Sequence, residues 1–167
     1  MTRARWIVVA VAAGCLMLAV LVGPAMQVGR MEGRSMAPTL DDQDRVIINR
    51  LAYATSSPRR GDVVMLRYPL DQRKSFVKRV IAVAGDRLRI EDGRVYVNDG
   101  PLEDGYVALS GRSHDSLGTQ VIPAEHYFVM GDRRNNSSDS RHWGLVKEDL
   151  ILGRVSLRFW PSFGTPQ

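Results

Sequence analysis

A stretch of 21 residues near the start of the chain, from Trp6 to Met26, contains no charged side chain and is rich in valine, alanine, leucine and methionine. As a helix, such a stretch is long enough to cross about 30 Å of hydrocarbon, the core of a bilayer. Arg3 and Arg5 precede it, and the positive-inside rule places them in the cytoplasm. The sequence therefore predicts a cytoplasmic N-terminus at residues 1–5, a transmembrane anchor at residues 6–26 and an extracytoplasmic domain at residues 27–167.

The same stretch also fits a secretory signal peptide that is cleaved after export. Residues 2–5 supply a basic start, and Gly23-Pro24-Ala25 supplies small residues at a plausible cleavage position. The apolar run is longer than the usual h-region of about 7 to 15 residues, which favours a retained anchor.

Beyond the anchor, short apolar runs alternate with turn-forming residues, as is typical of strands. Asp92-Gly93 lies between two alternating runs, a pattern that predicts a two-residue hairpin turn. Helical periodicity is scarce apart from a short turn at 147–150, so the predicted fold class is mostly β. Residues 103–120 are rich in Gly, Ser, Asp and Arg, and we interpret them as a mobile surface connection without a function. The runs interpreted as strands are residues 45–49, 62–68, 76–84, 87–90, 94–98 and 127–130.

The composition excludes several kinds of chemistry. The only cysteine, Cys15, lies inside the apolar stretch, so residues 27–167 contain neither a disulfide nor a catalytic thiol. The net charge of +5 comes from arginines scattered among acidic residues, which argues against a nucleic-acid partner. A basic surface beneath a membrane anchor is compatible with contact to anionic lipid head groups.

Ser35 and Lys78 are candidates for a catalytic pair. No histidine lies near either residue in the sequence, so a nucleophilic serine here would need a different base. A serine that attacks a carbonyl needs a proton acceptor, and a neutral lysine can fill that role. Lowering the pKa of a lysine from about 10.4 to about 7 or 8 requires roughly 3 to 4 kcal/mol in favour of the uncharged amine. Only a dry, apolar site supplies this preference. The apolar neighbours of Lys78 are Phe76, Val77, Val80 and Ile81.

Four segments carry a specific combination of serine, glycine, aspartate, lysine and arginine. In these segments, and in their order, the chain resembles the type I signal peptidases, and the resemblance extends from the N-terminal apolar stretch to Arg158-Phe159-Trp160-Pro161. The segments are Ser35-Met36-x-Pro38-Thr39-Leu40, Gly61-Asp62-Val63-Val64, Lys78-Arg79-Val80 with Gly85-Asp86, and Gly131-Asp132-x-Arg134-x-Asn136-Ser137-x-Asp139-Ser140-Arg141.

The resemblance implies a signal-peptidase-like β-fold of antiparallel sheets behind one transmembrane helix, with no cofactor and no metal. Ser35 then corresponds to the nucleophile and Lys78 to the general base. The family's matching serine, here Ser137, binds the lysine amine. The supporting residues implied by the resemblance are Ser137, Asp139, Arg141 and Arg79, with a salt bridge between Asp139 and Arg141.

The resemblance also implies cleavage of secretory preproteins after Ala-x-Ala at the outer face of the cell membrane. Shallow apolar pockets for the small residues are expected, with the substrate strand beside residues 30–34 and 74–77. Two departures from the family pattern affect fine geometry. Gly33 replaces a serine that contributes an oxyanion donor in some members, while Arg133 and Asn135 replace the common asparagine and aspartate. The residues expected to line the pockets are Met31, Met36, Leu40, Phe76 and Val77.

Three other functions stay open. A specialised peptidase for a pilin-like or conjugation substrate differs from a general one only in its narrow substrate range. A non-catalytic, membrane-anchored β-domain that binds extended peptides would have no need of Ser35 and Lys78. A self-cleaving regulator needs an internal cleavage site, and Ala84-Gly85 lies within the lysine motif.

Overall fold

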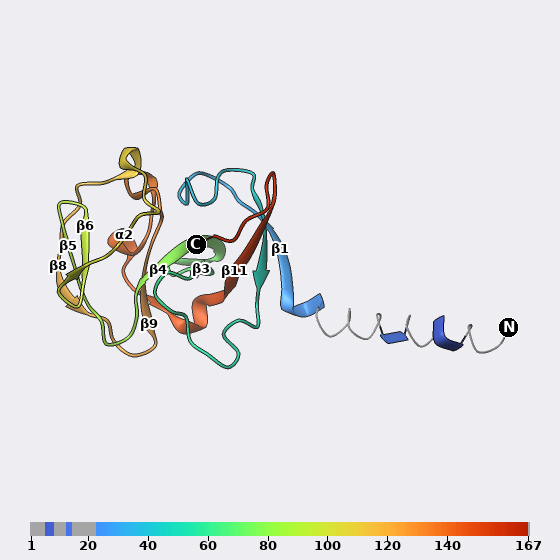
Figure 1. Ribbon diagram of the computed structural model, residues 1–167. Coiled ribbons are helices and arrows are strands. Elements are labelled where there is room, and N and C mark those ends of the chain that lie inside the picture. Colours follow the sequence, from blue (N-terminus) through green and yellow to red (C-terminus); the bar gives the residue numbers. More distant parts are fainter. Residues whose placement is uncertain (1–5, 9–12, 15–22, 167) are drawn as a thin grey trace.

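The computed structural model describes residues 6–8, 13–14 and 23–166, so most of the predicted transmembrane anchor lies outside the described residues. At its end, Gly23–Ala25 form the short helix η1, and Met26 begins strand β1 (Met26–Arg30). Among the described residues, no helix has the length and apolarity needed to span a bilayer. Helix η1 and strand β1 lie at one edge of the domain (Figure 1).

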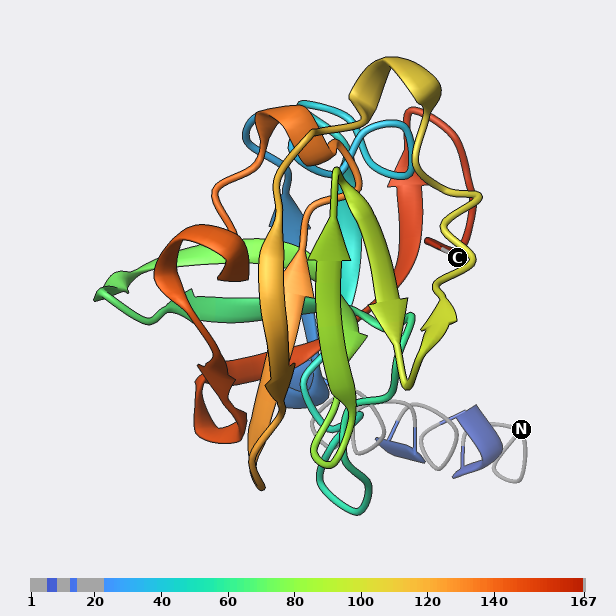
Figure 2. The ribbon, with the colours of Figure 1, turned by 90° about the vertical axis from the view of Figure 1, so that its left-hand side faces the viewer.

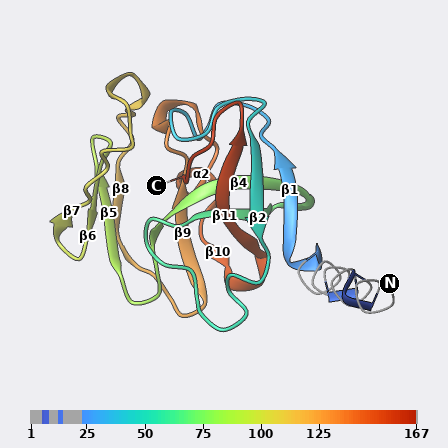
Figure 3. The same cartoon turned by 45° about the vertical axis from the view of Figure 1, so that its right-hand side comes forward.

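A seven-stranded antiparallel sheet forms the larger part of the domain. Its strand order is β1-β2-β11-β3-β4-β9-β10, and Figure 3 shows β1, β2 and β11 side by side. The strands predicted at 45–49, 62–68 and 127–130 are present within one residue of their expected bounds. The strands that follow β1 are β2 (Arg45–Asn49), β3 (Val63–Tyr68), β4 (Asp71–Ala82), β9 (His126–Met130), β10 (Val146–Lys147) and β11 (Ile151–Trp160).

A second sheet of four strands, in the order β7-β6-β5-β8, covers one side of the first (Figure 2). Its central strands β5 (Arg87–Glu91) and β6 (Arg94–Val97) form the predicted hairpin, with Glu91 paired to Arg94. Asp92 and Gly93 both have positive φ, as a type I′ turn requires. The outer strands are β7 (Gly100–Pro101) and β8 (Leu117–Val121).

Helices are short in the described part of the chain, which confirms the mostly β fold class. The turn expected at 147–150 is the helix η4 (Glu148–Leu150). The others are α2 (Ser140–Trp143), η2 (Leu109–Gly111) and η3 (Arg134–Asn136).

Residues 103–120 lie mostly at the surface, as expected, but they are not merely an irregular connection. This segment contains η2 and β8, and its side chains pack on the arginines of the motif segments. Its polar composition suggested a solvated loop, but the polar groups have protein partners rather than only water.

Strand β4 connects the two halves of the domain and passes from solvent into the interior. Its first residues are exposed, and its last five are buried. Ile81 and Ala82 belong to the apolar cluster shared with the four-stranded sheet. Consequently Lys74 has a side chain that is 67% exposed, while Lys78, four residues later, is only 3% exposed.

Candidate active site

Lys78 lies between two serine hydroxyl groups that come from distant parts of the sequence. Its Nζ is 2.9 Å from Oγ of Ser35 and 3.1 Å from Oγ of Ser137. Lys78 is on β4, Ser35 is on the turn that follows β1, and Ser137 follows η3. The folded chain therefore brings together the two predicted catalytic residues and one predicted supporting residue.

The surroundings of Lys78 favour its neutral amine. Burial lowers the pKa of Lys78 from 10.5 to about 8, with Arg141 acting in the same direction and Asp139 opposing it. The ring of Phe76 lies 5.5 Å from Nζ and covers one side of the amine. At a pH near 8, the amine can therefore accept a proton from a neighbouring hydroxyl.

The turn that carries Ser35 is anchored by its apolar residues. Met36 and Leu40 are both 0% exposed and belong to the cluster beneath the turn, and the N–H of Leu40 donates to the carbonyl of Met36 at 2.9 Å. The N–H of Gly33 donates to Oδ1 of Asp42 at 2.8 Å, with Gly33 at a φ of 84°. Ser35 is thus held in place because Met36 and Leu40, in the same turn, are buried in the core.

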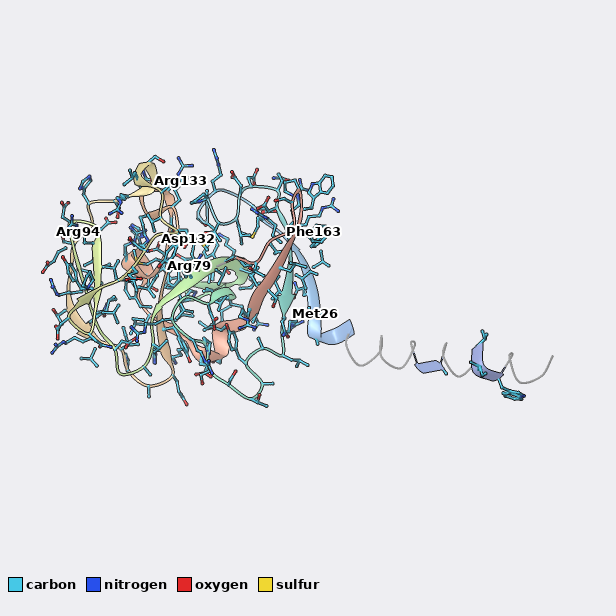
Figure 4. All side chains as sticks on the ribbon, viewed as in Figure 1. Met26, Arg79, Arg94, Asp132, Arg133 and Phe163 are labelled. Atoms are coloured by element: carbon cyan, nitrogen blue, oxygen red, sulfur yellow. The ribbon has the colours of Figure 1, made fainter. Side chains whose placement is uncertain are left out.

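A buried ion pair joins this turn to β4. Arg79 donates from Nε and Nη2 to the two carboxylate oxygens of Asp132, at 2.9 and 2.7 Å, and from Nη1 to the carbonyl of Gly61 at 2.9 Å. Asp132 in turn accepts a 2.5 Å bond from Oγ1 of Thr39. Figure 4 shows Arg79 and Asp132 close together inside the domain. Asp132 and Thr39 were not among the predicted site residues, although both stand in the motif segments that identified Ser35 and Lys78.

A second buried ion pair lies beside Ser137. Nη2 of Arg141 is 2.7 Å from Oδ2 of Asp139, and this carboxylate also accepts the N–H of Gly131 at 3.0 Å. Burial alone would raise the pKa of Asp139, but the bonds from Arg141 outweigh it and lower the pKa below its ordinary value. Asp139 therefore remains charged and holds Arg141, whose Nη2 also donates to the carbonyl of Ser137 at 3.5 Å.

A cavity of about 190 Å³ opens beside Ser35, between the end of β1 and the middle of β4. Met31, Phe76 and Val77, three of the five residues expected to contact substrate, line it together with Ser35. Met36 and Leu40 do not line it, because their side chains point into the core cluster behind its wall. Of the five residues expected to line the pockets, Met36 and Leu40 are therefore the two that lie outside this cavity.

Comparison with known proteins gives a consistent result. The profile of the family described as "Signal peptidase, peptidase S26" matches residues 3–160. The chain is 41% identical over 133 residues to a probable signal peptidase I-2 of Synechocystis sp., covering 76% of this chain and 60% of the relative. It is 38% identical over 135 residues to a signal peptidase I of Leptolyngbya laminosa, covering 76% and 65%. The chain thus spans less than two thirds of the length of these two relatives.

Two further matches are more complete. A signal peptidase IB of Staphylococcus aureus is 37% identical over 147 residues, which cover 78% of this chain and 76% of the relative. The crystal structure of a signal peptidase I from Enterococcus faecalis superposes with a TM-score of 0.52 at 26% identity, covering 60% of this chain and 97% of that one. The chain belongs to the signal peptidase family S26.

Proposed function

We propose that this protein is a membrane-anchored type I signal peptidase, a serine endopeptidase that removes signal peptides from exported preproteins. The observation that carries the proposal is the buried amine of Lys78, 2.9 Å from the hydroxyl of Ser35. A serine and a neutral lysine at this distance form a nucleophile and its base.

In the proposed reaction, Oγ of Ser35 attacks the scissile carbonyl while Nζ of Lys78 takes the hydroxyl proton. Gly33 has no side-chain donor, so the backbone N–H of Ser35 is the candidate donor to the oxyanion. Lys78 then gives the proton to the leaving amine as the C–N bond breaks, which leaves an ester on Ser35. Water hydrolyses this ester, with Lys78 taking the water proton and returning it to Ser35. Ser137 orients the lone pair of the amine without restoring its charge.

The lining of the cavity beside Ser35 supports a binding site for apolar side chains. Met31, Phe76 and Val77 form part of its wall next to the nucleophile, and its volume is about 190 Å³. We propose that it receives the small apolar residues that precede the cleavage site in an Ala-x-Ala signal.

Cleavage of a precursor with an Ala-x-Ala signal by the detergent-solubilised full chain tests this function. We expect one cut after the second alanine, and a loss of at least about 10³-fold for Ser35→Ala, since removal of a nucleophile leaves only binding and oxyanion stabilisation. Ser110→Ala, an exposed serine on η2, is the control and should retain wild-type rates. A folded wild type that binds the precursor without cutting it would favour a peptide-binding domain, while cutting confined to one native substrate would favour a specialised peptidase.

We also propose that the apolar stretch from Trp6 anchors the protein in the cell membrane with the β-domain outside. The predicted end of the anchor at residue 26 is wrong, because Met26 is the first residue of β1 and pairs with Asn49. Exposed Met26 and Val28 on β1 and exposed Trp160 and Phe163 near the C-terminus support lipid contact, and Figure 4 shows Met26 and Phe163 on the same side of the domain. In membranes from expressing cells, we expect the full-length chain to resist alkaline carbonate extraction. Protease added from outside should digest the domain in spheroplasts. A shortened, extractable protein would instead indicate that the apolar stretch is a cleaved signal.

A further inference from the structure

The segment between β7 and β8, residues 102–116, contacts the active site although it lies outside every motif segment. Its groups accept hydrogen bonds from side chains that follow Asp132 in the sequence. These bonds are Asn135 Nδ2 to the carbonyl of Ser110 at 2.8 Å, Arg141 Nη1 to Ser113 Oγ at 3.1 Å and to Asp115 Oδ2 at 2.5 Å, and Arg134 Nη1 to Asp104 Oδ2 at 3.5 Å.

In this segment, Tyr106 contacts strand β4, which carries Lys78 and Arg79. The centre of its ring is 4.1 Å from Cζ of Arg79, which places the ring against the face of the guanidinium. The edges of the same guanidinium are occupied by Asp132 and by the carbonyl of Gly61. A cavity of about 540 Å³ lies beside Arg79 and has Tyr106 in its wall. Arg79 lines this cavity as well, and the ring of Tyr106 covers one face of its guanidinium there.

We infer that Tyr106 is a positioning residue for Ser35 and Lys78, an inference that rests on the proposed peptidase function. It acts through Arg79 and does not contact substrate. An ion pair kept from water is stronger and more rigid than one that water screens. The ring keeps water from the guanidinium face that it covers, and it adds a cation–π contact.

The Arg79–Asp132 ion pair connects the contact of Tyr106 with Arg79 to the turn that carries Ser35. Arg79 follows Lys78 on β4, and Asp132 holds Thr39 on the turn that carries Ser35. The next residue after Asp132, Arg133, donates its N–H to the carbonyl of Ser35 at 3.0 Å. A weaker ion pair would therefore let the turn shift relative to β4. Such a shift would change the 2.9 Å distance between Nζ of Lys78 and Oγ of Ser35.

Steady-state cleavage by the full chain tests the inference. We expect Tyr106→Leu to lower kcat about tenfold, the scale of one cation–π contact out of water, with KM changed less than about twofold. Tyr106→Phe keeps the ring and should stay within about twofold of wild type in both parameters. Leu109→Ala, on the same segment and 83% exposed, is the matched control and should be unchanged.

A double-mutant cycle separates positioning from a general loss of stability. If Tyr106 acts through Asp132 and Thr39, the variant with both Tyr106→Leu and Thr39→Val loses less activity than the product of the two single effects. Multiplicative effects would overturn the inference. So would a lower melting temperature with unchanged kcat, or a rise in KM alone. Tyr106→Met, which has no ring but fills the space, repeats the test if Tyr106→Leu does not fold.

Labelling of Ser35 by a serine-reactive phosphonate provides a second readout that needs no peptide substrate. Wild type that is labelled but does not cut precursors would refute the proposed function, and the labelling rates would still test Tyr106. A labelling rate for Tyr106→Leu equal to that of wild type would overturn the inference even if wild type cuts normally.

Discussion

The kcat/KM for precursor cleavage is expected to fall about tenfold for each pH unit below the pKa of Lys78, which is about 8. Only the neutral amine can accept the proton of Ser35, and its fraction decreases in this way as the amine becomes protonated. Burial sets this pKa, with Arg141 lowering and Asp139 raising it. A pH–rate profile between pH 5 and about 9 measures the position of this limb.

The variant Lys78→Met tests whether the acid limb of the pH–rate profile comes from Lys78. We expect this variant to lose at least about 10³-fold in kcat, because it removes the base but retains most of the side-chain volume. Lys74→Met, on the same strand but with a side chain 67% exposed in the wild type, should cut at the wild-type rate with the wild-type pH profile. An acid limb near 10.5, or a Lys78→Met variant with a tenth or more of wild-type activity, would contradict the role of Lys78 as base.

The stability of Lys78→Met shows whether its loss of activity could come from unfolding. The pKa of Lys78 is about 8 in the folded protein against an ordinary value of 10.5, so between these values the unfolded chain binds more protons and the free energy of unfolding rises with pH. Below this window, the buried amine lowers the free energy of unfolding by up to about 3 kcal/mol, at 1.36 kcal/mol per pH unit. Lys78→Met removes this cost, so at pH 7 we expect it to unfold at a higher temperature than wild type.

The sequence predicted most strands correctly, and the structure places Ser35 and Lys78, the proposed catalytic pair, within hydrogen-bond distance. The hairpin at Asp92-Gly93 was identified because only a few dipeptides suit positive φ at two successive positions. Ser35 and Lys78 were identified by motif order. By contrast, β4 begins at Asp71, five residues before the predicted start, because its polar first part is held by pairing with β3 and not by burial.

Side-chain direction and long-range contact could not be predicted in the same way. Met36 and Leu40 belong to a turn, where no simple alternation tells which residues face the core and which face substrate, and both face the core. Tyr106 meets Arg79 across 27 residues, and its segment has the composition of a solvated loop. Contacts of this kind depend on how the two sheets pack, which is not written in a local pattern.

Gly131→Ala is expected to lower kcat by about 10²-fold or more, since displacements of about 1 Å at reacting groups cost this much. A Cβ at this position would lie 2.3 Å from Oγ of Ser137 and 2.5 Å from the carbonyl oxygen of Ser35. Both distances are too short for any contact, so one or both serines must move. The backbone of Gly131 has no positive φ in the structure, so the expected effect comes from this collision and not from backbone strain.

The same substitution at Gly118 on β8 is the matched control, because a Cβ there meets no atom within 4 Å. We expect Gly118→Ala to cut at the wild-type rate. Overpacking at Gly131 also costs about 1 to 3 kcal/mol of stability, so kinetics must be measured at a temperature where circular dichroism shows a folded variant. Under that condition, a Gly131→Ala protein with wild-type kcat would mean that Ser35 and Ser137 tolerate displacement. Catalysis would then not depend on the distances of 2.9 and 3.1 Å that join them to Lys78.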